Sequence, residues 1–330
     1  MEQHVADPVA TPAVPPAASL GIWRTQSAGI LFVVMVVGLI VAPFVTYPLF
    51  LMQVMCFALF ACAFNLLIGY VGLLSFGHAL YFGWGSYLSA YAAKAWGLTP
   101  ELAILTGTTA GALLGLLAGS LAIRRQGIYF AMITLALAQM MFFFALQAKF
   151  TGGEDGIQAV PRGRLFGLVD LNQPLAMYGF VMAIFLGGFL LIWRVVHSPF
   201  GQVLKAIREN EARAISLGYD ADRCKHIAFV ISGGVAGLAG ATKAIVFQLA
   251  SLTDVHWTMS GEVVLMTLLG GLGTLFGPVI GAAIIITMQN YLAQLGAWVT
   301  VVQGVIFVLC VLAFRRGVIG ELARWLKKSL

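Results

Sequence analysis

Apolar residues occur along this 330-residue chain in long runs that are separated by short polar segments. A helix needs about 20 mainly apolar residues to cross the hydrocarbon core of a membrane, which is about 30 Å thick. The runs that meet or approach this length are 28–47, 48–68, 73–93, 102–123, 128–146, 174–193, 226–250, 257–292 and 298–314. The pattern predicts an all-α polytopic membrane protein.

The run 257–292 is too long for one span, and helix-breaking residues lie in its middle. These residues are Gly270, Gly271, Gly273, Gly277 and Pro278, and they favour a turn. Two passes give about ten transmembrane helices in all, and they leave 257–270 as a short pass of about 21 Å. Other helices must surround such a short pass, because lipid cannot satisfy its terminal backbone groups. A broken helix at membrane depth is also typical of a transport pathway.

Composition supports the membrane assignment, since 60% of the residues are hydrophobic and only 10% are charged. Globular proteins carry about a quarter charged residues. The net charge of +6 does not indicate nucleic-acid binding, because the basic residues fall between the apolar runs and form no basic domain. The four cysteines show no disulfide framework and no metal-binding spacing, so we expect them to be packing residues.

Lysine and arginine set the expected orientation, because short loops rich in them stay in the cytosol. With the amino terminus inside, the basic residues on the cytosolic side are Arg24, Arg124, Arg125, Arg194, Lys205, Arg208, Arg213, Arg223 and Lys225. Those left outside are Lys94, Lys149, Arg162 and Arg164. We expect a disordered cytosolic tail over 1–27, a transmembrane domain with an uncleaved first span over 28–314, and a basic cytosolic tail over 315–330.

The segment 194–225 is an internal stretch crowded with charges. Ser198 can cap a helix, Pro199 suits a first helical turn and Gly218 suits a left-handed end, so a helix is expected between them. Its mostly apolar stripe consists of Val203, Ile207, Asn210, Ala214 and Leu217. Such a helix can dock in the groove of a partner or lie on lipid headgroups, and these residues alone favour neither.

The sequence from Ile207 to Asp220 resembles the EAA loop of bacterial ATP-binding-cassette (ABC) importer permeases, and specifically that of the LivM-type branched-chain amino acid permease family. Arg213 stands where the general pattern has its second alanine, and Gly218 comes one position late. Three further stretches, 69–85, 151–162 and 270–282, resemble the same family. The similarity runs from about position 49 to position 314.

The resemblance implies a permease subunit of an ABC importer in the bacterial inner membrane, with a translocation path for branched-chain or related amino acids. The implied partners are a homologous second permease, two cytosolic ABC ATPases, a periplasmic substrate-binding protein and membrane lipid, without a cofactor. The stretch 211–218 would be the coupling helix that an ATPase receives. The expected coupling residues are Glu209, Glu211, Ala212, Arg213, Ala214 and Gly218.

Glycine and polar positions within the spans are the candidates for the translocation path. They are Ser75, Gly77, His78, Glu262, Gly270, Gly271 and Gly273. Helix packing is the alternative role for the glycines, and a satisfied core position is the alternative for His78. The candidates for docking the binding protein are Thr151, Gly152, Gly153, Glu154, Asp155 and Gly156. A plain solvated turn is the alternative there.

No phosphate-binding Gly-x-x-x-x-Gly-Lys-Ser/Thr motif occurs in the sequence, so ATP hydrolysis would have to come from another polypeptide. A nucleophile elbow and a His-Glu-x-x-His pattern are also missing, so the chain is not expected to be an enzyme. The competing hypothesis is an autonomous ion-coupled carrier. That carrier would need ion ligands at unwound helices, and only Asp254 and Glu262 lie near such a position.

Overall fold

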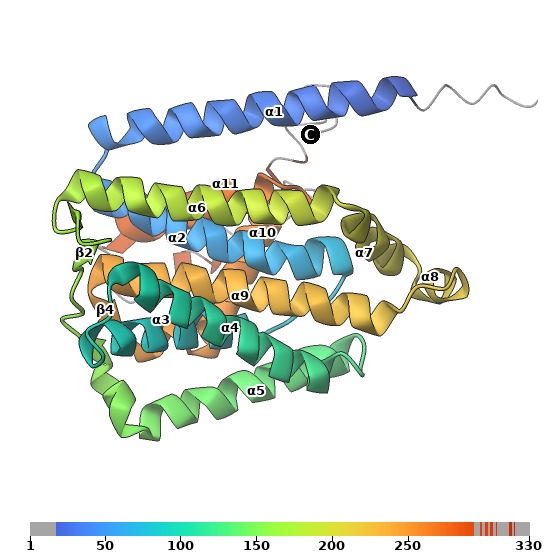
Figure 1. Cartoon of the computed structure of the whole chain (residues 1–330). Coiled ribbons are helices and arrows are strands. Elements are labelled where there is room, and N and C mark those ends of the chain that lie inside the picture. Colours follow the sequence, from blue (N-terminus) through green and yellow to red (C-terminus); the bar gives the residue numbers. More distant parts are fainter. Residues whose placement is uncertain are drawn as a thin grey trace, which may run out of the picture.

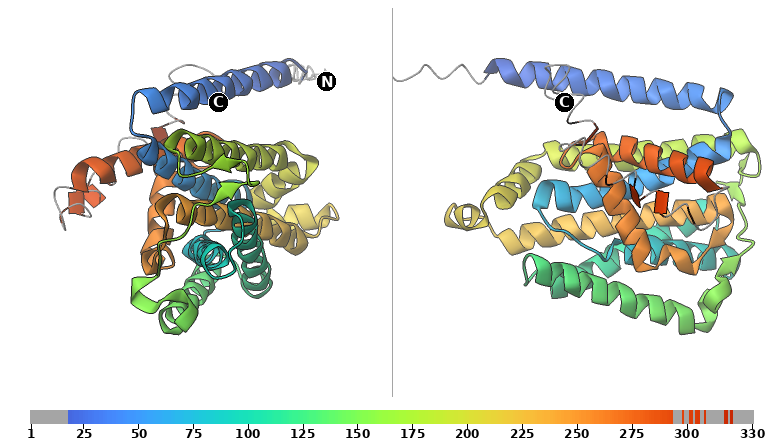
Figure 2. Two further views of the ribbon diagram at one scale, coloured as in Figure 1. Left: turned by 60° about the vertical axis from the view of Figure 1, so that its left-hand side comes forward. Right: turned by 180° about the vertical axis from the view of Figure 1, so that it is seen from behind.

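The computed structural model describes residues 18–293 and scattered positions between 298 and 320. Most of its helices lie side by side along one direction, and α1 runs along the edge of the bundle (Figure 1). Helices α7 and α8 project from one end, while the short strands gather at the opposite end. Figure 2 shows the same two ends from behind. We call them the α7–α8 end and the strand end.

The helices are α1 (Ala18–Val41), α2 (Pro48–Asn65), α3 (His78–Lys94), α4 (Pro100–Ala122), α5 (Ile128–Gln147), α6 (Pro174–His197), α7 (Pro199–Glu209), α8 (Glu211–Ser216), α9 (Ala221–Phe247), α10 (Trp257–Gly270) and α11 (Gly277–Leu292). Strand β1 (Ile157–Gln158) pairs antiparallel with β4 (Leu249–Ala250), and β2 (Arg164–Leu165) pairs antiparallel with β3 (Val169–Asp170). Proline opens α2, α4, α6 and α7. Its missing N–H costs little in a first turn, where no helical partner exists.

The prediction of an all-α membrane protein is confirmed. Among the described residues, five helical stretches are long and apolar enough to cross a membrane: Pro48–Val71, Pro100–Ala122, Ile128–Gln147, Pro174–His197 and Ala221–Phe247. The predicted break within 257–292 is present, because α10 ends at Gly270 and α11 begins at Gly277. Most of the predicted span 298–314 lies outside the described residues, so the total of about ten spans stays a prediction.

Two predicted boundaries differ from the structure. The span expected over 73–93 begins only at His78, because α2 ends in a π-helical turn, η2 (Leu66–Val71), and the chain then runs without helix from Gly72 to Gly77. Helix α1 begins at Ala18 and so includes residues 18–27, which we expected in the disordered tail. Residues 1–17 and most of the tail 315–330 lie outside the described part.

Helices α3, α4 and α9 form the most closely packed part of the bundle, and small residues allow their contact. Helix α4 carries glycine at every fourth position from Gly107 to Gly119, which places these residues along one face. This face meets Gly233 and Gly237 of α9. A Cβ atom added at Gly237 would lie 2.8 Å from the Gly107 carbonyl oxygen and 2.9 Å from Gly111 Cα. The backbones of these helices therefore touch directly, as small residues permit in membranes.

Helix α1 is attached to the bundle through α6. The Phe32 ring meets the edge of the Trp193 ring at 5.4 Å between centroids, and the Tyr178 hydroxyl donates a 2.6 Å hydrogen bond to the Leu39 carbonyl. The opposite face of α1 exposes apolar side chains that include Ile30, Val34 and Val37. Such a face is suited to lipid.

Replacing Gly237 with alanine tests the close packing of α4 and α9. The added methyl group should push these helices apart and lower the free energy of unfolding by about 1–3 kcal/mol, a typical cost of overpacking. The measurement is the thermal midpoint of the detergent-solubilised protein. Gly187→Ala on α6 is the matched control, because a Cβ there meets nothing within 4 Å, and its midpoint should not fall. Equal midpoints for the two variants would contradict the proposed contact.

Candidate functional site

The charged loop folds into two helices instead of the single helix that we expected between Pro199 and Gly218. The Ser198 hydroxyl caps α7 by accepting a hydrogen bond from the Gly201 amide at 3.3 Å. Helix α7 stops at Glu209 because Asn210 is extended, with φ −158° and ψ 99°. The Asn210 side chain then caps α8 by accepting from the Arg213 amide at 3.0 Å. Gly218 has φ +89°, so the predicted left-handed end is confirmed.

Glu211 fixes the base of α8 to the membrane bundle. Its carboxylate forms an ion pair with Lys225 of α9, whose side chain is only 2% exposed. The other carboxylate oxygen accepts a 2.9 Å hydrogen bond from the Gln126 amide in the α4–α5 loop. A buried lysine left without its counter-charge is strongly destabilising, so this pair holds α8 in place.

The apolar stripe predicted for the loop is divided between two environments. Ile207 and Ala214 are buried and pack with Ala221 at the start of α9. Leu217 is 69% exposed, and its neighbours Ile215 and Tyr219 are exposed as well. We call Ile215, Leu217 and Tyr219 the α8 patch. Among the expected coupling residues, Glu209, Ala212, Arg213 and Gly218 are also exposed, whereas Ala214 is not.

The non-helical segment 72–77 lies inside the bundle and finds its hydrogen-bond partners there. Ser75 is fully buried, and its hydroxyl accepts from the Gly77 amide at 3.2 Å. The Phe76 amide donates to the Thr134 hydroxyl of α5 at 3.2 Å. Gly77 lies so close to α5 that an added Cβ would be 2.7 Å from the Thr134 carbonyl oxygen. Backbone without helix survives at membrane depth only where protein or trapped water satisfies it.

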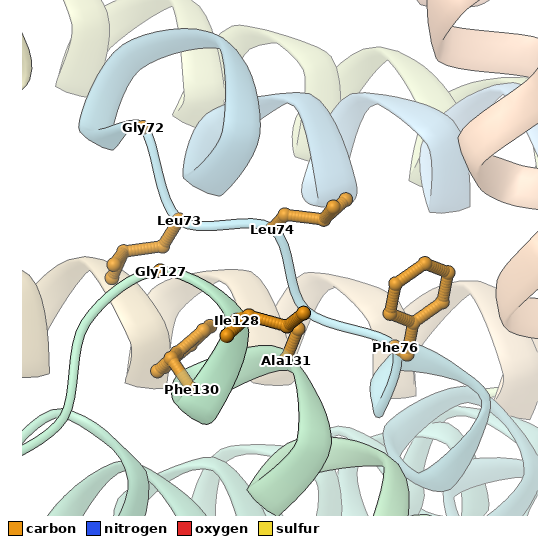
Figure 3. Close-up of a pocket in the computed structure, with 8 residues that line it drawn as sticks. All are labelled: Gly72, Leu73, Leu74, Phe76, Gly127, Ile128, Phe130 and Ala131. Atoms are coloured by element: carbon orange, nitrogen blue, oxygen red, sulfur yellow. The ribbon is translucent and has the colours of Figure 1, made fainter.

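A cavity of about 400 Å³ lies between this segment and the start of α5 (Figure 3). One wall comes from the segment 72–76 and the other from the first residues of α5. Its lining consists of Gly72, Leu73, Leu74, Phe76, Gly127, Ile128, Phe130 and Ala131. Since no lining side chain carries a polar group, the cavity suits an aliphatic group.

His78 opens α3 in fully buried surroundings. Its Nε2 lies 3.0 Å from the Ser232 hydroxyl oxygen of α9, and that hydroxyl donates to the Ala63 carbonyl of α2 at 2.6 Å. Because the Ser232 hydroxyl proton points to the Ala63 carbonyl, the Nε2–H group of His78 is the donor in its bond with Ser232. The rings of Phe64, Tyr81 and Phe229 surround the imidazole. These hydrogen bonds join α2, α3 and α9, whereas the buried Nδ1 of His78 has no hydrogen-bond partner.

The other polar candidates within the membrane also have partners. Glu262 of α10 lies near Gln289 of α11. Lys243 of α9 forms an ion pair with the buried Asp254, whose carboxylate also accepts from the Ser251 amide at 3.4 Å. Among the described residues, no group of three or more His, Cys, Asp or Glu side chains is arranged to hold a metal ion.

Gly270 ends α10, and Gly271 and Gly273 lie in the loop 271–276 between α10 and α11. Both loop glycines have positive φ, at +119° and +73°. A Cβ on Gly270 would lie 1.9 Å from the Gly277 carbonyl oxygen, so α10 and α11 can meet closely at the loop. The structure thus places these three residues at the α7–α8 end, apart from Glu262.

The residues 151–156 form a compact turn at the strand end. The Thr151 hydroxyl is buried and donates to the Ala145 carbonyl at 2.6 Å. Gly152, Gly153 and Gly156 all have positive φ. A Cβ at Gly156 would lie 2.2 Å from the Ala250 carbonyl oxygen, next to the pairing of β1 with β4. Glu154 and Asp155 remain exposed on this rigid support.

Sequence reasoning missed the side chains that hold these parts together. Asn65 is a polar residue in an apolar span, and it forms hydrogen bonds to the α10–α11 loop. The pairing of Glu211 with Lys225 joins residues from different helices, and no spacing rule relates them. The repeated glycines of α4 are the one signal in the sequence that indicates its close packing against α9.

Comparison with known proteins agrees with this architecture. A family model described as "Branched-chain amino acid transport system / permease component" matches residues 46–311. The chain is 24% identical over 278 residues to the high-affinity branched-chain amino acid transport system permease protein LivM of Salmonella typhimurium, and 25% identical to LivM of Escherichia coli. Each of these alignments covers 77% of this chain and 65% of the relative.

Permeases for other solutes are also similar to this chain. The ribose import permease protein RbsC of Bacillus subtilis is 30% identical over 197 residues, which are 54% of this chain and 58% of that protein. No solved structure matches. With four fifths of its length matched by the family model, the chain belongs to the family of permease components of branched-chain amino acid transport systems.

Proposed function

We propose that this chain is the permease subunit of an ABC importer for branched-chain or related amino acids, and that an ATPase subunit receives α8. The observation that carries this proposal is the α8 patch on a rigid base. Ile215, Leu217 and Tyr219 expose apolar surface, while the ion pair of Glu211 with Lys225 fixes the helix beneath them. Exposed apolar groups on a short helix favour docking in the groove of a partner.

The proposed orientation places the α7–α8 end in the cytosol and both termini on that side of the inner membrane. The basic side chains at this end support it, since loops rich in lysine and arginine stay inside. They include Arg124 and Arg125 in the α4–α5 loop and Arg194, Lys205, Arg208, Arg213 and Arg223 near α7 and α8. A cytosolic ATPase would then meet α8 directly.

A second, homologous permease is the proposed partner within the membrane. Helix α5 is mainly apolar but buries little of its surface against this chain. Its exposed large side chains are Ile128, Tyr129, Met132, Met140, Phe143 and Phe144. We place the translocation path between this face and the second permease, next to the segment 72–77 with Ser75 and Gly77. The apolar cavity beside that segment suits an aliphatic side chain of the substrate.

The proposed mechanism is a population shift between outward-open and inward-open states, driven by ATP-dependent closure of two ATPase subunits. Closure would displace α8. Glu211 would pass this displacement to α9 through Lys225 and to the start of α5 through Gln126. The cavity leaves room for the start of α5 to move against the segment 72–76.

An autonomous ion-coupled carrier is the competing proposal. It would need buried acidic ligands that are available to an ion at an unwound helix. Asp254 is instead paired with Lys243, and Glu262 lies near the amide of Gln289. These partnerships favour the ABC permease over the carrier.

The test of the function uses the full tagged chain purified from its native membrane. We expect a second permease, an ABC ATPase and a substrate-binding protein to copurify, and mass spectrometry of the ligand held by that binding protein identifies the substrate class. Proteoliposomes of the whole complex should accumulate leucine or valine only when ATP is supplied to the ATPase side. Accumulation by this chain alone under a sodium or proton gradient would overturn the proposal.

Replacing Leu217 with aspartate tests the α8 patch. The charge should weaken binding of the ATPase subunit by at least about tenfold, because apolar anchors at an interface contribute about 2 kcal/mol or more. The measurement is the amount of ATPase retained on the purified permease across a concentration series. Gln202→Asp on the exposed side of α7 is the control and should bind normally. Unchanged binding by the Leu217 variant would exclude the patch as the docking surface.

Replacing Gly218 with valine tests the turn after α8. Gly218 has φ +89° and an added Cβ meets nothing within 4 Å, so the substitution adds backbone strain without a clash. We expect ATP hydrolysis to continue while uptake per ATP falls about tenfold or more, because a strain of about 1–3 kcal/mol moves α8 relative to its base. Gly97→Val carries the same kind of strain, with φ +64° in open space at the strand end, and should transport normally.

Reversing the charge of Glu154 and Asp155 tests the turn at the strand end. With lysine at both positions, the concentration of binding protein that half-saturates ATPase stimulation should rise about tenfold or more, because charge complementarity governs encounter at such rims. The measurement is ATPase activity of the reconstituted complex at low and high salt. Gln173→Lys adds positive charge at the same end and should leave this concentration unchanged. The same half-saturating concentration for the unchanged chain, the double lysine variant and Gln173→Lys would argue for a plain solvated turn.

A further inference from the structure

Arg208 connects α7 to the end of α2. Its guanidinium Nη1 donates to the carbonyl oxygen of Gly69, which lies in the π-helical turn η2. The last carbonyls of a helix have no partner in the helix itself, so they accept bonds from basic side chains readily. On the preceding turn of α7, the Lys205 ammonium lies 5.6 Å from the centre of the Tyr70 ring. Two successive basic residues of α7 therefore hold η2.

Glycine residues make the room that the Arg208 side chain occupies. A Cβ at Gly72 would lie 3.2 Å from Arg208 Cγ, and a Cβ at Gly273 would lie 3.1 Å from Arg208 Nη1. The stem of the arginine thus rests on the end of α2, and its guanidinium lies against the α10–α11 loop. A side chain at either glycine would press on the arginine and strain the backbone, because both glycines have positive φ.

Asn65 completes the connection from the other side. It is 3% exposed, and its amide nitrogen donates to the Thr274 carbonyl at 2.8 Å. Its amide oxygen accepts from the Gly273 amide at 3.0 Å. One side chain of α2 therefore holds two successive residues of the α10–α11 loop. We call Asn65, Gly69, Arg208 and Gly273 the Arg208 junction.

The Arg208 junction and the Glu211 ion pair lead to different parts of the molecule. Glu211 connects α8 to α9 and to the α4–α5 loop. Arg208 connects α7 to α2 and to the α10–α11 loop. Because α7 and α8 are separated at the extended residue Asn210, a force on α8 alone cannot run through one continuous helix into both parts.

We propose that Arg208 is a positioning residue which passes displacement of α7 to the α10–α11 loop through Gly69 and Asn65. The inference rests on the proposed function, because it takes an ATPase at the α7–α8 end as the source of the displacement. It adds a second route for the movement, besides the one through Glu211, and makes the short helix α10 a responding element. Loss of the arginine leaves both elements folded but separates their movements.

The test measures movement of the α10–α11 loop in the complete complex with its ATPases. Leu272 lies in the loop and is 38% exposed, so Leu272→Cys, placed in a Cys224→Ser background, reports the loop by its rate of maleimide labelling. We compare nucleotide-free complex with complex trapped by ATP and vanadate. In the chain with Arg208, trapping should change the labelling rate. In Arg208→Ala this change should shrink by about two- to thirtyfold, the range for loss of a coupling contact.

The controls separate coupling from mere support of the loop. Arg223→Ala removes an equally exposed cation at the same end and should keep the full response. Arg208→Lys keeps the charge but lacks the planar guanidinium, and it should keep part of the labelling response. The nucleotide-free labelling rate should stay the same in Arg208→Ala.

Three outcomes would overturn the inference while leaving the proposed function intact. They are an equal response with and without Arg208, no response in an assembled complex that still contains Arg208, and a nucleotide-free rate that already differs in Arg208→Ala. The last of these would mean that Arg208 only maintains the resting shape of the loop. Failure of the chain to bind any ABC ATPase would instead overturn the proposed function, and it is detected before labelling begins.

Discussion

Direct backbone contact among α3, α4 and α9 is the constraint on which the rest of the structure depends. Lipid offers no hydrophobic drive for helices to associate, so packing of small residues must hold them. Glycines of α4 and α9 allow the closest approach, and Gly85 of α3 joins them with a Cβ position 2.5 Å from the Gly237 carbonyl oxygen. In the proposed mechanism, a displacement applied to α9 through Lys225 would therefore move α3 and α4 as well.

Around this block, three irregular stretches of backbone receive hydrogen bonds or contacts from side chains of other elements. The π-turn of α2, the segment 72–77 and the α10–α11 loop all lack regular helical bonding, and each has a partner from a distant element. Asn65, Thr134 and Arg208 supply these partners. Because each partner is a single side chain, these regions can rearrange by exchanging a few hydrogen bonds while the helices remain intact. This combination suits the proposed change between outward-open and inward-open states.

The hydrophobic pattern predicted most spans and the break within 257–292 correctly. Spans were identified because 20 apolar residues suffice to mark one, and the glycine-rich break in 257–292 was recognised from local turn chemistry. The expectation of a single helix over the charged loop was wrong, because α7 ends before Asn210 and α8 begins after it. An asparagine can lie within a helix or cap the start of a new one, and its position in the stripe did not distinguish the two. The start of α3 was misplaced because the residues Leu73–Leu74 are apolar, and apolarity does not distinguish a buried extended segment from a helix.

The sequence by itself determined the membrane class, most span positions, the left-handed end at Gly218 and the resemblance to a permease family, because composition, turn residues and motifs are local properties of the chain. Only the tertiary structure decided which face of the charged loop turns inward and that His78 forms a hydrogen bond with Ser232. It also decided that Asn65, Gly69, Arg208 and Gly273 meet. These contacts join residues up to 208 positions apart. Such contacts depend on how the helices pack, and packing is set by side chains from several segments together.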